Sequence, residues 1–125
     1  MPNIGINFLK CAVLYAIAGM ALGIYMAITN DHSQAPTHAH NNLLGWVSMA
    51  LMGLTFRTWP KLAVGTLPKA VFWLMNLGAI LMDVGLFLLF NANSAGEKVA
   101  AVASISLIVA MILFALLVYR ANTTD

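Results

Sequence analysis

A polar, metal-capable cluster opens a long apolar run in the stretch Thr37-His38-Ala39-His40-Asn41-Asn42-Leu43-Leu44-Gly45-Trp46. Two of the three histidines of the chain lie here, next to two asparagines. Polar and ionisable side chains are costly inside a membrane and usually serve a function there. Because the rest of the sequence is so apolar, we expect the chemistry of the protein to depend on this stretch.

The composition is that of a membrane protein, since 62% of the 125 residues are hydrophobic and only 8% are charged. Ordinary soluble domains are about half apolar and about a quarter charged. A helix needs roughly 20 apolar residues to cross a bilayer, and four such segments fit into this chain. The sequence predicts one integral membrane domain (1–125), all-α and multi-pass, with helices over 8–29, 36–57, 69–90 and 97–119.

Short connections make sequential helices antiparallel neighbours, so both termini and the connection between the second and third helices lie on one side. Five of the six basic residues are on that side, and only Lys98 is opposite. The positive-inside rule then predicts cytoplasmic termini, and histidines at the outer, periplasmic face of a bacterial inner membrane. The formal charge of +2 follows from this topology and implies no nucleic-acid partner.

The two histidines point to opposite sides of the predicted second helix, because residues two apart are separated by about 200° around a helix axis. The side of His38 has room for a flat ring or another helix and continues through Asn42, Gly45, Met49 and Gly53. The side of His40 would suit the apolar wall of a cofactor pocket and continues through Leu43, Leu44, Val47, Leu51 and Leu54. The competing interpretation is that both histidines are merely hydrated at the membrane surface.

Two further ionisable residues are candidates for this site. Asp83 falls about 10 Å below the outer end of the third helix, and a carboxylate at that depth should point inward. It is a candidate second-shell partner of an imidazole or a proton acceptor, and equally a structural tie between helices. His32, in the outer connection, is a candidate additional ligand.

The first helix carries small residues at spacings of three or four, which in lipid favour a close helix contact. They are Ala12, Ala16, Gly19, Gly23 and Ala27. Cys11, the one cysteine in the chain, is interpreted as a small packed residue.

The run Thr37–Leu54 resembles the His-x-His helix in the catalytic subunit of the haem-copper oxidase superfamily, especially its nitric-oxide-reductase and related oxidase branches. The resemblance covers the His-x-His pair and the Gly-Trp that follows. It implies that one histidine ligates a low-spin haem and the other a high-spin haem. Asn41 and Asn42 would then tune these ligands or contact the propionates, with Gly45 beside the cofactor.

In that superfamily the catalytic subunit has twelve helices in three arcs of four, and the His-x-His helix is the second of its arc. The resemblance therefore implies one arc, which a homotrimer would complete. A bis-histidine haem needs imidazoles on both faces of the ring, so His38 of one copy and His40 of the next are expected to clamp it. The sequence shows no second histidine cluster for a dinuclear centre, which leaves enzymatic turnover open.

The sequence thus predicts a membrane-bound b-type haem protein for electron transfer or diatomic gas binding, with its redox partner unspecified. A first alternative is a copper or other transition-metal site built from His38, His40, His32 and nearby methionines. A second alternative is a non-catalytic subunit or assembly partner of a larger membrane complex, docked through the glycine-rich helix face.

Overall fold

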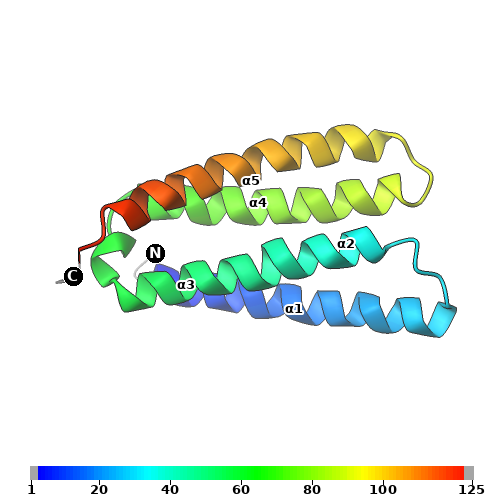
Figure 1. The fold of residues 1–125 in the computed structure, drawn as a ribbon, viewed down its shortest axis with the longest axis horizontal. Helices are drawn as coiled ribbons and strands as arrows, with labels where there is room; N and C mark the ends of the chain where they lie inside the picture. Colours follow the sequence, from blue (N-terminus) through cyan, green and yellow to red (C-terminus); the bar gives the residue numbers. More distant parts are fainter. Residues whose placement is uncertain (1–2, 123–125) are drawn as a thin grey trace.

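Residues 3–122 are described by a computed structural model, in which that range forms helices and short connections without a strand. Four antiparallel rods follow one another along the chain (Figure 1). The first is α1 (Ile4–Thr29), the third is α4 (Leu67–Leu89) and the fourth is α5 (Ala95–Tyr119). The predicted all-α fold with four helices is confirmed.

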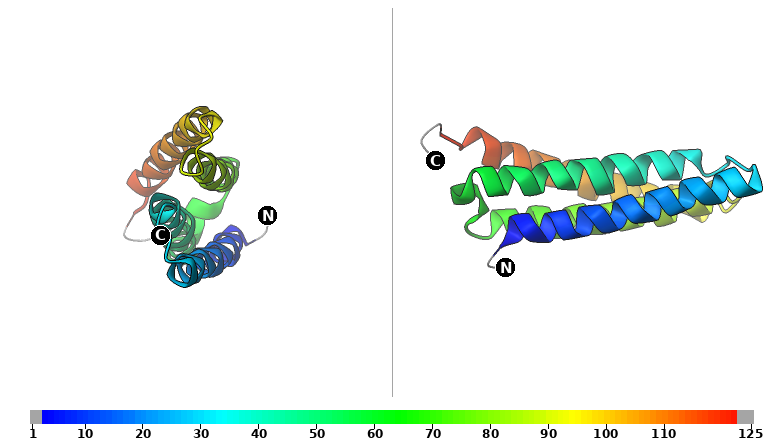
Figure 2. Two further views of the ribbon diagram at one scale, coloured as in Figure 1. Left: turned by 90° about the vertical axis from the view of Figure 1, so that its right-hand side faces the viewer. Right: turned by 90° about the horizontal axis from the view of Figure 1, so that it is seen from below.

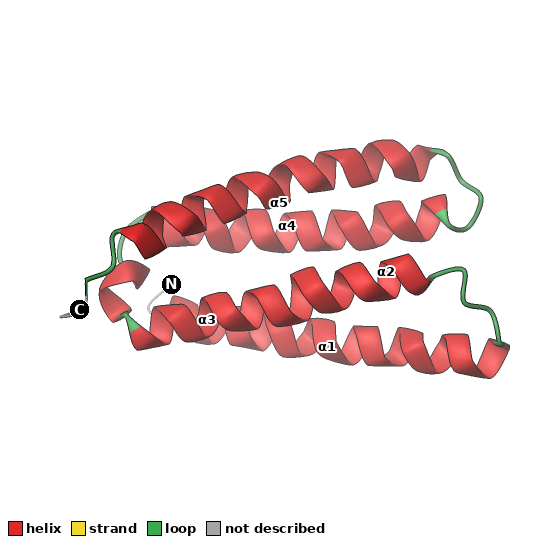
Figure 3. Ribbon diagram, viewed as in Figure 1, coloured by secondary structure: helices red, strands yellow, loops and turns green. Residues whose placement is uncertain are grey.

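The second rod is a composite of three helical segments that run on without interruption (Figure 3). It comprises α2 (Ala35–His40), the π-helical segment η1 (Asn41–Ser48) and α3 (Met49–Thr58). The short 3₁₀ helix η2 (Pro60–Ala63) then leads to α4. The sequence predicted this rod as one uniform helix over 36–57, and the π-helical middle is a correction.

The bounds of the other rods agree with the sequence to within a few residues, except that α1 begins at Ile4 and not near residue 8. Helices α1, α4 and α5 are each long and apolar enough to cross a membrane. The start of α1, the helix η2 and the end of α5 lie at one end of the molecule, called here the inner end (Figure 1). The cluster around His38 and His40 lies toward the opposite, outer end.

The rods form two hairpins, with α1 packed against the composite rod and α4 against α5. Viewed end-on, α1 and α5 lie at opposite edges, with the composite rod and α4 between them (Figure 2). The arrangement is therefore an open row of rods in which the two edge helices remain largely exposed.

An aromatic cluster joins all four rods toward the inner end. The ring of Phe8 in α1 lies 5.4 Å from that of Phe56 in α3 and 5.1 Å from that of Phe72 in α4, measured between centroids. Phe114 in α5 packs on Phe56 at 5.8 Å. Such pairs contribute about 0.5–1.5 kcal/mol each beyond the area they bury. The two hairpins are thus fastened together at the end remote from the histidines.

The predicted close contact of the small residues of α1 is made within the chain. Ala12, Ala16 and Gly19 are buried, whereas Ala27 is exposed and takes no part. Near the inner end, a Cβ at Gly53 would lie only 2.8 Å from the carbonyl oxygen of Gly5. The backbones of α1 and α3 therefore approach too closely for a larger side chain.

One polar contact between α4 and α5 gives a matched pair of serine variants. Ser106 is buried and donates a hydrogen bond to the carbonyl of Leu74 at 2.8 Å, whereas Ser104 is exposed and bonds only Ala100 in its own helix. We expect Ser106→Ala to lower the free energy of unfolding in detergent by about 1 kcal/mol, and Ser104→Ala to leave it unchanged. Equal effects of the two variants would contradict this assignment.

Candidate functional site

The outer part of the composite rod places its two histidines on different sides. His38 is half-buried and faces α1, whereas His40 is exposed. Below His38 the positions Gly45, Met49 and Gly53 are buried, as expected of a face that packs on protein. The side of His40 continues through exposed apolar residues, namely Leu43, Val47, Leu51 and Leu54.

His38 is held at both ring nitrogens. Its Nδ1 lies 2.9 Å from the carbonyl oxygen of Gly19 in α1, and its Nε2 lies 3.2 Å from Nδ2 of Asn42. Because a carbonyl oxygen only accepts hydrogen bonds, Nδ1 carries the proton and Nε2 accepts from the Asn42 amide. The imidazole also rests on α1 at Gly23, where an added Cβ would lie 3.1 Å from its Cε1.

His40 is held at one ring nitrogen. Its Nδ1 lies 2.8 Å from the carbonyl oxygen of Pro36, one helical turn earlier. By the same reasoning Nδ1 carries the proton, and the lone pair is on Nε2. A backbone carbonyl that fixes the tautomer in this way is the usual support of a metal-ligating histidine. His40 therefore presents Nε2 on an exposed part of the rod.

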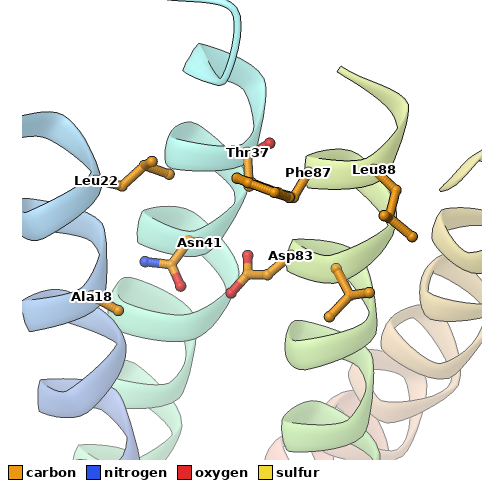
Figure 4. A pocket seen from close by; sticks show the side chains of 8 residues that line it. Ala18, Leu22, Thr37, Asn41, Asp83, Phe87 and Leu88 are labelled. Carbon is orange, nitrogen blue, oxygen red and sulfur yellow. The ribbon is translucent and has the colours of Figure 1, made fainter. Parts of the chain in front are cut away.

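The side chain of Asn41 lines the space between the hairpins. It is only 5% exposed, and its Nδ2 donates to the carbonyl of Tyr15 in α1 at 2.8 Å. On the opposite wall, Asp83 of α4 points toward Asn41 (Figure 4). The prediction that Asp83 faces inward is confirmed, since its Oδ1 is buried.

Two cavities of about 380 Å³ each meet at this pair, and both are lined by Ala18, Asn41 and Asp83. The outer cavity also contacts Leu22, Thr37 and Phe87 (Figure 4). The other cavity extends inward and is lined by Cys11, Tyr15 and Asn76, among others. The hydroxyl of Tyr15 donates to Oδ1 of Asn76 at 3.1 Å, which links α1 to α4 below the pair.

The structure brings together only part of the set predicted from the sequence. His38 and Asn42 are in contact, but the room expected beside Gly45 is filled by the ring of Tyr15, which would lie 2.5 Å from an added Cβ. The Nδ1 atoms of both histidines bond backbone carbonyls, and Asp83 Oδ1 has no hydrogen-bond partner. Asp83 is thus not seen to support an imidazole.

The remaining predicted ligand, His32, is exposed in the connection between α1 and α2. Nearby in that connection, the backbone N–H of Ser33 donates to Asp31 at 3.0 Å and lowers the pKa of that carboxyl. Within residues 3–122, no three histidine, cysteine or acidic side chains lie close enough together to hold a metal ion.

The sequence interpretation did not identify two residues that orient polar side chains in this site. Gly19 supplies the carbonyl that orients His38, and Tyr15 supplies both the carbonyl that orients Asn41 and the ring that covers Gly45. A backbone acceptor leaves no mark in the sequence, and Gly19 had been noted only as a packing residue.

No family model, curated protein or solved structure matches this chain.

Proposed function

We propose that the protein is a membrane-bound b-type haem protein with His40 as the first axial ligand. The observation that carries this proposal is the state of His40, whose Nδ1 is bonded to the carbonyl of Pro36 while its Nε2 lone pair is on an exposed face. A neutral imidazole held in this tautomer suits haem iron. The apolar side chains of Leu43 and Val47, exposed below it, suit the rim of a porphyrin.

His38 is proposed as the second axial ligand, supplied by a neighbouring copy. The two imidazoles of one chain lie on different sides of the rod. One chain therefore does not place an imidazole on each face of the same haem ring. The Nε2 of His38 already carries the lone pair, and only the Asn42 amide has to turn away to release it. A closed ring of copies repeats this pairing at each interface, and a homotrimer agrees with the resemblance to one arc of a twelve-helix subunit.

The open row of helices supports such an assembly, because α1 and α5 lie at its edges with much of their surface exposed.

In the proposed membrane orientation, the inner end lies in the cytoplasm and the histidines lie at the periplasmic face of a bacterial inner membrane. The basic residues support this orientation. At the inner side are Lys10, Arg57, Lys61, Lys69 and Arg120, and at the outer side is Lys98.

When bound, haem supplies an iron that exchanges single electrons or binds a diatomic gas. The chain's own part is to hold the two imidazoles in the ligating tautomer and to surround the ring with apolar side chains. Electron transfer is therefore the function proposed here, with gas binding where one axial position stays open.

The visible absorption spectrum of protein purified after expression with ample haem tests this proposal. We expect a Soret band and reduced-state bands of b-type haem, which disappear in the double variant His38→Ala, His40→Ala. Bands that survive the double variant, or their absence from the wild type, would refute it. Bound copper without porphyrin would select the metal-site alternative, and a co-purifying chain without any cofactor would select the subunit alternative.

A further inference from the structure

Two buried oxygen atoms face the space between the hairpins without a hydrogen-bond partner. They are Oδ1 of Asn41 and Oδ1 of Asp83, both shielded from solvent. Figure 4 shows the two side chains pointing toward each other from the composite rod and α4. A buried acceptor without a donor is destabilising, more so in a membrane where water is scarce. The pair therefore needs a donor between its members.

The orientation of Asn41 is fixed, which makes the side facing Asp83 an acceptor. Its Nδ2 donates to the carbonyl of Tyr15 at 2.8 Å, and a carbonyl cannot serve as donor to the amide oxygen. Turning the amide over would place two oxygens against each other at Tyr15. Asn41 consequently presents Oδ1, and only Oδ1, to the pair.

Neighbouring polar groups are already engaged elsewhere. Thr37 donates to Oε1 of Gln34 at 2.6 Å, and Gln34 donates to the carbonyl of Phe87 at 3.1 Å. The hydroxyl of Tyr15 donates to Asn76. These groups are satisfied within the protein, in contrast to the pair of Asn41 and Asp83.

Neither cavity is lined by a lysine or an arginine that could pair with the carboxyl. Of the titratable side chains on the surrounding elements, Cys11 and Tyr15 on α1 line the inward cavity. The others are Lys10 and Tyr25 on α1, His38 and His40 on α2, Arg57 on α3, Lys69 on α4, and Glu97, Lys98 and Tyr119 on α5. Nδ1 of His38 bonds the carbonyl of Gly19, and Nδ1 of His40 bonds the carbonyl of Pro36. The one donor that the pair can gain without another molecule is a proton on Asp83 itself.

We propose that Asn41 and Asp83 form a proton-binding site between the two hairpins. The carboxylate of Asp83 takes up one proton from a hydronium ion, which leaves as water, and the resulting O–H donates to Oδ1 of Asn41, directly or through one water molecule. Proton uptake removes the buried charge and supplies the missing donor in the same step. The outer cavity, of about 380 Å³, borders the pair on the side toward the outer end. The site does not depend on haem.

Infrared spectroscopy of the cofactor-free protein tests this directly, with aspartate labelled by ¹³C at the carboxyl. At neutral pH we expect the carbonyl stretch of a protonated aspartic acid, which is lost in Asp83→Asn. Asp31→Asn is the matched control and should keep the band, since the hydrogen bond from Ser33 lowers the pKa of Asp31 and leaves it ionised. In Asn41→Leu the band should shift to higher frequency, because the acid loses its acceptor.

A spectrum with only ionised aspartate at neutral pH would overturn the proposal, and so would a protonated band that persists in Asp83→Asn. A band from Asp83 that does not move in Asn41→Leu would overturn the shared site. Helical content measured by circular dichroism shows whether each variant is folded, and the labelled wild type tests the protonation without any substitution. Because the measurement uses protein without haem, failure of the haem proposal leaves its outcome unaffected.

Discussion

His40→Ala is expected to lose haem binding, with an affinity at least about 100-fold below that of the wild type. Removing only a supporting group around a metal ligand weakens binding by roughly 10–100-fold, and His40 is proposed as the ligand itself. His40 is exposed and bonds Pro36 through Nδ1, whereas Nε2 of His38 accepts from Asn42. Titration of the cofactor-free protein with haem, followed at the Soret band, measures the change.

His38→Ala is the matched variant, two residues away on the same rod. It should keep a Soret band but show a five-coordinate, high-spin spectrum that binds carbon monoxide readily, because only the second ligand is lost. An equal loss of haem affinity in both variants would show that the two histidines act as equivalent ligands. Full retention of haem in His40→Ala would refute the role assigned to its Nε2.

Gly19→Leu is expected to separate α1 from η1 and to lower the free energy of unfolding by about 3 kcal/mol or more. A Cβ at Gly19 would collide with Oδ1 of Asn42 and lie 2.7 Å from Nδ2 of Asn41. Overpacking of a close contact typically costs about 1–3 kcal/mol, and each buried hydrogen bond left open adds about 1–3 kcal/mol. Thermal or denaturant unfolding in detergent, followed by circular dichroism, measures the effect.

Ala21→Leu gives the control for this variant, because Ala21 is in the same helix but exposed. It should change the free energy of unfolding little. If Gly19→Leu is no more damaging than Ala21→Leu, the close approach of α1 and η1 described here is wrong. If the protein is destabilised but the hydrogen bond at His38 Nδ1 persists in nitrogen-detected NMR, the link from Gly19 to the imidazole is wrong.

The number and direction of the helices could be predicted because each rod is a nearly continuous apolar segment bounded by polar or proline-containing connections. The opposite placement of His38 and His40 was also accessible, since it depends only on their spacing of two residues. The inward direction of the Asp83 carboxyl followed from the cost of a carboxylate in lipid. In each case a local property of the chain determines the outcome.

Other features depend on contacts between rods and could not be predicted in the same way. The widened turns of Asn41–Ser48 leave no simple sequence signal, although they determine which side chains lie beneath the histidines. The bond from the Asn41 amide to the carbonyl of Tyr15 depends on where α1 lies. The carbonyl of Gly19 is a backbone group, so no residue type indicates that it would orient His38.

The π-helical segment η1 has a consequence for how the site is aligned along the composite rod. Segments of this kind hold backbone hydrogen bonds five residues apart, where an α-helix holds them four apart. A change within 41–48 that restored α-helical winding without removing a residue would turn the outer portion of the rod by about 100° relative to α3. His40 would swing around the axis while the aromatic cluster at Phe56 stayed in place. The angular setting of the imidazoles therefore depends on the winding of this segment and not on the packing that fastens the four rods together.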